Sequence, residues 1–198
     1  MKTANREMSL RGYTLVELLV VVAVLAIAGT LLLPNLIDRG TFAIQAAARS
    51  IVSDIVFAQS DALANQEYRR FQFIGADAGS EGYSGYCITR VNPTNMAWPF
   101  DEDSADYVDD WMGSAQSTGR FIVDFESDDR FRGVSINRVN LDAGLDYMTF
   151  DEYGGSISSA GGAPGIGGVI ELTSQGHQYR VSVAPFTGKT TVEVLNSP

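Results

Sequence analysis

The chain has 198 residues, of which 45% are hydrophobic, so it can build one domain with a real core and is not a disordered polymer. Its formal net charge is −10, and without residues 1–12, which hold three basic residues and one acidic residue, 11 basic and 23 acidic residues leave −12. Such a surface repels the phosphates of nucleic acids, so general DNA or RNA binding is disfavoured.

Histidine and cysteine occur once each, as His177 and Cys87. A lone cysteine forms no disulfide within the chain, and one residue of each type supplies neither a structural zinc site nor a Cys/His catalytic pair well. His177 follows Gln175-Gly176 and is interpreted as a solvated turn residue between two strands. We therefore expect no enzyme activity, no cofactor and no metal site.

The segment 13–33 is an apolar block of 21 residues with one charge, Glu17. As a helix it would span about 31 Å, enough to cross a hydrocarbon core of about 30 Å. Lys2, Arg6 and Arg11 precede it, which predicts a cytoplasmic N-terminus and an exported C-terminal part. A secretory signal peptide has a shorter apolar region followed by a small-residue cleavage site, so a single transmembrane helix is favoured.

Glu17 has two interpretations. A carboxylate in a membrane helix costs roughly 2.5–3.5 kcal/mol near the centre, which makes it a functional candidate by default. Alternatively, Thr14-Leu15-Val16-Glu17 fits the capping-box pattern, in which Glu17 closes the first helical turn. Both interpretations can hold, because Glu17 lies near the end of the block.

The segment 11–20, RGYTLVELLV, resembles the processing site of type IV pilins and type II secretion pseudopilins. In those families a basic leader ends in glycine and is followed by an aromatic residue, Thr-Leu and Glu. The resemblance implies that a prepilin peptidase cuts between Gly12 and Tyr13 and methylates the new amine of Tyr13. Pro34, 22 residues into the mature chain, also matches a proline common in these proteins.

The resemblance implies a role in assembly for Glu17, and physical chemistry supports it. After cleavage, the charged amine of Tyr13 is poorly placed in lipid, and Glu17 of an adjacent subunit would neutralise it. The pair forms only at the correct axial offset, so the carboxylate selects the register between the N-terminal helices of neighbouring subunits.

Beyond residue 33, the chain predicts an α+β fold. Pro34 should kink the helix near residues 31–33. The segment 34–66 is expected to continue it as an amphipathic helix, with Arg49, Asp54, Gln59 and Asp61 mostly off the apolar stripe, where they can face water. That stripe has spacings of 4, 3, 4, 3 and 4 and consists of Ile44, Ala48, Ile51, Ile55, Ala58 and Ala62.

The segment 67–198 is expected to form a β-rich globular domain on which the helix packs. Strands are predicted at 69–74, 86–91, 121–126, 133–139, 147–151, 169–173, 179–184 and 190–195. The segments 92–119 and 154–168 are predicted loops. The acidic run 101–110 offers oxygen ligands for calcium but lacks the spacing of an EF-hand loop, so a solvated acidic loop is favoured.

A second resemblance concerns the amphipathic helix. Residues 46–62 and the C-terminal segments 150–155, 168–172, 179–183 and 187–189 are similar to the GspH/FimT group, with Gln59 in place of the usual Arg and Asp61 in place of the usual Glu. This implies a minor pseudopilin of a type II secretion pseudopilus, rooted in the inner membrane with a periplasmic domain. A minor type IV pilin that takes up DNA is the alternative, and a membrane-anchored enzyme is a weaker one.

Overall fold

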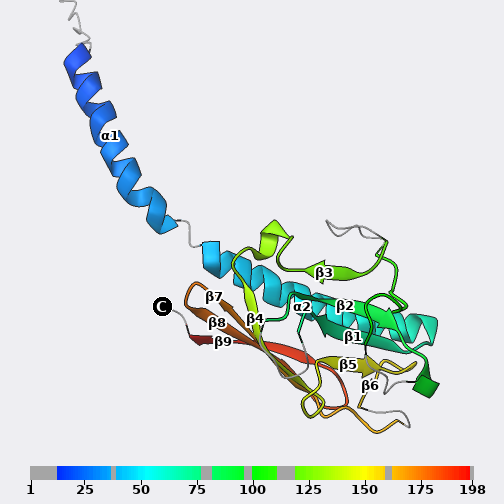
Figure 1. The fold of residues 1–198 in the computed structure, drawn as a ribbon. Coiled ribbons are helices and arrows are strands. Elements are labelled where there is room, and N and C mark those ends of the chain that lie inside the picture. Colours follow the sequence, from blue (N-terminus) through cyan, green and yellow to red (C-terminus); the bar gives the residue numbers. More distant parts are fainter. Residues whose placement is uncertain are drawn as a thin grey trace, which may run out of the picture. The chain divides into compact units, whose positions relative to one another are not determined.

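The structure, a computed structural model, describes residues 13–36, 39–76, 82–95, 100–110, 119–158 and 162–196. The predicted leader 1–12, with Gly12, lies outside these residues. The chain divides into two compact units, Met1–Asp38 and Arg39–Pro198. The first contains helix α1, and the second contains helix α2 and all the described strands (Figure 1).

Helix α1, Leu15–Leu36, has 22 residues and is therefore about 33 Å long. Its side chains from Leu15 to Ile27 are all exposed, at 80% and 63% at the two ends of that stretch. The helix includes Pro34 and ends at Leu36, and the kink expected from this proline remains a prediction. An apolar helix with an exposed surface needs lipid or protein around it.

Helix α2, Arg39–Asn65, carries the predicted apolar stripe on its buried face. Ile44, Ile51, Ile55, Ala58 and Ala62 are all 0% exposed, and they form one core cluster with side chains of both sheets. By length and composition alone, Gly40–Asn65 of α2 would pass as a membrane span. In α1 the part whose side chains are described, Leu15–Gly29, is apolar but shorter. The buried stripe makes α2 the core helix of the globular unit.

Two antiparallel sheets pack against α2 (Figure 1). The first has the order β3-β2-β1-β5-β6 and the second the order β4-β7-β8-β9. The strands are β1 Arg69–Ile74, β2 Gly85–Arg90, β3 Ile122–Asp124, β4 Ser135–Leu141, β5 Tyr147–Phe150, β6 Ser156–Ile157, β7 Gly168–Ser174, β8 His177–Val183 and β9 Thr190–Asn196. Two short 3₁₀ helices are η1 Pro93–Asn95 and η2 Asp129–Phe131.

The α+β fold predicted from the sequence is therefore confirmed. All eight predicted strands are present, and their ends shift by no more than a few residues. Strand β6 was not predicted, because it consists of two residues inside a segment rich in Gly and Ser. The acidic loop is more ordered than predicted. Its backbone forms isolated antiparallel β-bridges, one between Tyr107 and Thr89 and one between Asp109 and Arg120.

Of the off-stripe residues of α2, Arg49 is exposed as predicted, whereas three others are half-buried and bind other parts of the globular unit, which corrects the prediction. The Asp54 carboxylate accepts a hydrogen bond from the Tyr86 hydroxyl at 2.6 Å. Gln59 donates from Nε2 to the carbonyl oxygen of Gly154 at 2.6 Å, and Asp61 forms an ion pair with Arg69. Polar groups on this helix thus bind the first sheet and the turn between β5 and β6, beside the apolar stripe.

The interpretation of His177 as a solvated turn residue was wrong. His177 is the first residue of β8, is only 6% exposed, and lies with Nε2 2.9 Å from the Thr41 hydroxyl. Gly40 directly precedes Thr41, and a Cβ on Gly40 would lie 2.8 Å from the Gln175 side-chain oxygen. The absence of a side chain at Gly40 lets the β7–β8 turn pack against the start of α2.

Asp54 gives the globular unit a pH dependence. Burial raises the pKa of its carboxyl above the ordinary value of 3.8, although the Tyr86 and Ser50 hydroxyls donate to it and Arg130 lies nearby. The folded state therefore holds this proton more tightly than the unfolded state, and stability falls as pH rises from about 3.8 through the raised pKa.

The Asp54→Asn variant of the full chain in detergent should lose less thermal stability than the wild type between pH 4 and pH 7. Melting temperatures across that range are the measurement. Glu126→Gln, which changes an exposed side chain, is the matched control and should follow the wild type. Parallel curves for all three proteins would show that the Asp54 proton does not couple to folding.

Candidate functional site: the N-terminal end of helix α1

The first turn of α1 has a capped geometry. The Thr14 hydroxyl accepts a hydrogen bond from the backbone N–H of Glu17 at 3.2 Å, and the Thr14 carbonyl accepts one from Leu18 at 3.2 Å. Thr14 is therefore the N-cap residue, and Glu17 is the third residue of the helix. This cap depends on the backbone of Glu17 and on the side chain of Thr14.

The Glu17 carboxylate itself lies in the first turn of α1 and is exposed. The positive end of the helix dipole favours a negative charge at this position. Tyr13, which precedes the cap, is 83% exposed. Tyr13, Thr14 and Glu17 therefore share one exposed helix end, with an apolar helical surface behind them that can bind lipid or another helix.

Comparison with known protein families finds a known motif at this end of the chain. Residues 9–33 match the prokaryotic N-terminal methylation motif. The chain carries a prepilin signal. No curated protein and no solved structure is significantly similar to the chain.

The prepilin signal indicates a type IV pilin-like or pseudopilin-like protein. It points to a structural subunit rather than an enzyme, and it implies processing by a prepilin peptidase and assembly with other pilin subunits. Together with α1, it is consistent with an anchor in the inner membrane. The narrower resemblance to the GspH/FimT group is not part of the matched motif and stays a prediction.

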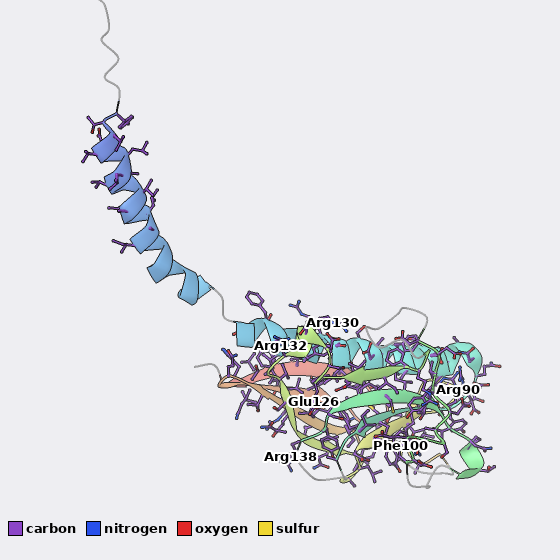
Figure 2. All side chains as sticks on the ribbon, turned by 45° about the horizontal axis from the view of Figure 1, so that its top comes forward. Arg90, Phe100, Glu126, Arg130, Arg132 and Arg138 are labelled. Atoms are coloured by element: carbon purple, nitrogen blue, oxygen red, sulfur yellow. The ribbon has the colours of Figure 1, made fainter. Side chains whose placement is uncertain are left out.

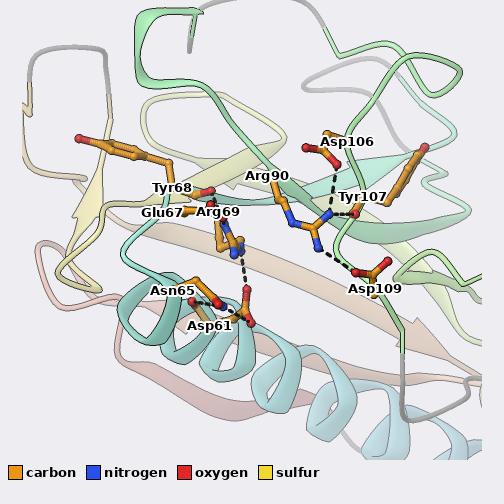
Figure 3. A network of polar contacts seen from close by, with 9 residues as sticks. All are labelled: Asp61, Asn65, Glu67, Tyr68, Arg69, Arg90, Asp106, Tyr107 and Asp109. Atoms are coloured by element: carbon orange, nitrogen blue, oxygen red, sulfur yellow. Dashed lines mark hydrogen bonds and ion pairs between the residues drawn. The ribbon is translucent and has the colours of Figure 1, made fainter.

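The acidic run 101–110, for which the sequence favoured a solvated loop over a calcium site, is tied to Arg90 in the structure (Figure 3). Arg90 donates to Asp106 at 3.1 Å, to Asp109 at 3.0 Å and to the Tyr107 carbonyl at 2.6 Å. Within the residues that the structure describes, no group of three or more potential ligand side chains has the arrangement of a metal site. The visible role of these two aspartates is to hold the loop along strand β2.

Three arginines at the surface of the globular unit, Arg90, Arg130 and Arg132, have carboxylate partners. Figure 2 shows Arg90 apart from Arg130 and Arg132. Arg130 pairs with Asp128 at 2.6 Å, and an ion pair also joins Arg132 to Asp129. Neighbouring carboxylates thus offset these positive charges, which disfavours their use in binding phosphates.

Of the residues that the sequence singled out, Tyr13 and Glu17 lie close together at this end of α1, and Pro34, the predicted kink, lies elsewhere. Thr14 caps α1 and Glu17 lies in its first turn. Tyr13 directly precedes the cap, whereas Pro34 lies near the other end of α1. The pairing of Glu17 with the amine of a neighbour remains a prediction, since it needs a second subunit. The contacts missed by the sequence analysis, such as Asp54 with Tyr86, join residues far apart in the chain and have no local signature.

Proposed function

We propose that this chain is a minor pseudopilin of a type II secretion system. It is cut between Gly12 and Tyr13, methylated on the amine of Tyr13, and held in the inner membrane by α1 with its β-rich domain in the periplasm. Glu17 pairs with the amine of a neighbouring subunit and sets the register. The subunit helps to start or cap the filament that drives protein export.

The prepilin signal at residues 9–33 carries this proposal. Three further observations support it: α1 is apolar with an exposed surface, the globular unit has its own core around α2, and the chain is acidic. The acidic surface favours the secretion filament over a pilus subunit that takes up DNA.

Processing is tested first on the membrane-extracted protein. Intact mass spectrometry should find a chain that starts at Tyr13 with one added methyl group, because the peptidase of this signal cuts after Gly12. The Gly12→Leu variant, which puts a bulky side chain at the cleavage site, should remain at full length. A mature chain that starts beyond Leu33, as ordinary signal peptidase would produce, contradicts the proposal.

DNA binding separates the secretion filament from the uptake pilus. The mature chain in detergent should shift labelled DNA weakly or not at all in a mobility assay, and with little dependence on salt, because it can neutralise few phosphates. A basic DNA-binding protein in the same detergent is the positive control. Tight binding that weakens steeply with salt would favour the pilus subunit instead.

A further inference from the structure

Helix α2 covers strands β7 and β8 of the second sheet, but it leaves the edge strand β9 partly uncovered. In its register, Ile170 on β7 lies opposite Val181 on β8, and Val181 lies opposite Val192 on β9. Residues directly opposite each other in antiparallel strands point to the same face. Ile170 and Val181 are 0% exposed, whereas Val192 is 44% exposed.

The next row of the sheet repeats this pattern. Leu172, Tyr179 and Val194 lie opposite one another, and their exposures are 0%, 8% and 56%. Gln45 of α2 donates a hydrogen bond to the Tyr179 hydroxyl at 3.3 Å, so this is the face that carries α2. In both rows the side chains on β7 and β8 are buried, and the valine on β9 is left half uncovered.

Val192 and Val194 form what we call the β9 ledge. The opposite face of the same strands is polar, since Glu193 lies opposite Arg180, and Arg180 is paired with Glu171 at 2.7 Å. An apolar strip that lies beside a helix on one face of a sheet has the geometry to take a second helix, at the usual separation of about 8–10 Å. The ledge therefore fits an apolar helix better than a polar peptide.

The chain itself contains an apolar helix of the kind that fits the β9 ledge. The side chains of α1 are exposed from Leu15 to Ile27, and in a filament outside the lipid they must be covered by protein. We propose that the β9 ledge binds the apolar N-terminal helix of a neighbouring subunit, which lies beside α2 on the second sheet. This inference rests on the proposed function and adds a specific interface on the globular unit to it.

An added strand is the main competing occupant. Strand β9 pairs with β8 and is the last strand in the order of its sheet, so its other edge offers backbone groups to an incoming strand. Such a strand would lie beyond β9 and would pack its side chains against Val192 and Val194 from the side only, whereas a helix would lie over them. The exposed pair on the helix-bearing face therefore favours a helix. A helix would contact this face alone, whereas an added strand would be reached from both faces of β9.

Site-specific crosslinking in cells tests the ledge. A photoreactive benzophenone side chain is placed at position 194, on the ledge, or at position 193, on the polar face of the same strand. Irradiation followed by mass spectrometry should link position 194 to the first helix of another subunit that carries the methylation motif. Position 193 should give at least five times less of this product.

Other products would overturn the ledge proposal. A link from both positions to a strand of another subunit would indicate strand addition, and a link to α1 of the same molecule would mean that the ledge is covered from within. The absence of any product from position 194, in filaments that contain the protein, would also contradict it.

Substitution gives a second test. The Val192→Thr, Val194→Thr double variant keeps the size and strand preference of both side chains but makes the ledge polar. Its incorporation into filaments should fall roughly five- to tenfold, because apolar area is no longer buried there. Glu193→Gln is the control and should assemble normally, and equal melting temperatures should show that both variants fold.

The outcomes separate this inference from the proposed function. Normal assembly of the double variant would refute the ledge while leaving the pseudopilin proposal intact. Failure of the wild-type chain to enter any filament would instead refute the proposed function.

Discussion

Replacing Glu17 by alanine is expected to block entry into filaments while membrane insertion and cleavage continue. If the carboxylate neutralises the amine of a neighbour, its loss leaves that amine unpaired in an apolar environment, and the register is no longer selected. Insertion should not suffer, because removing a charge from an apolar segment makes its transfer into the membrane easier. We expect at least a tenfold fall in co-purification with sibling subunits.

The capping geometry makes this experiment interpretable. The observed cap is formed by the Thr14 hydroxyl and the backbone N–H of Glu17, so it survives the replacement of the Glu17 side chain by that of Ala or Gln. Thr14→Ala removes the cap and keeps the carboxylate, at a cost of about 1 kcal/mol of helix-end stability. In a helix supported by lipid, this variant should assemble nearly as well as the wild type.

Glu17→Gln completes the set, since it keeps a polar side chain of the same size and loses the charge. It should fail as Glu17→Ala does. The measurement is the amount of each variant that co-purifies with sibling subunits from membranes, together with a cleavage assay on the same samples. Normal assembly of both Glu17 variants would rule out the register pair, and a defect confined to Thr14→Ala would show that capping is what matters.

Local patterns explain why much of the fold was predictable. The stripe from Ile44 to Ala62 has the period of a helix packed on one side, and the structure buries that side of α2. Alternation in the segment 179–183 likewise predicted the half-buried strand β8. Each pattern lies within one element, so it can be read without knowing the element's neighbours.

The features that the sequence did not predict depend on which elements pack against each other in the fold. His177 stands in a turn-like sequence, yet the start of α2 packs over it, with Thr41 at 2.9 Å. The exposure of Val192 and Val194 follows from the position of β9 at the edge of a sheet wider than α2, and an alternating strand by itself does not reveal this. The register between distant strands was needed to find the ledge.

The second large expected effect is on the stability of the globular unit. A residue near the end of α2 compensates the charge of a buried arginine. Arg69 is 2% exposed and pairs with Asp61 of α2 and, at 2.9 Å, with Glu67 (Figure 3). The Asp61 side chain is 20% exposed and also accepts a hydrogen bond from Asn65 at 2.9 Å, whereas Glu67 is 57% exposed. Asp61 is thus the more buried of the two carboxylates that compensate the guanidinium.

Asp61→Ala should therefore lower the stability of the globular unit by about 3 kcal/mol, because it leaves most of a buried charge without its partner. For a unit of this size that corresponds to a fall of roughly 6–12 °C in Tm. Glu67→Ala is the matched control and should cost less than about 1 kcal/mol, since an exposed ion pair is screened by water. Thermal melts of both variants of the full chain in detergent give the comparison. If the two fall by the same small amount, solvent reaches Arg69 in the folded protein, and the ion pair with Asp61 does not hold α2 to β1.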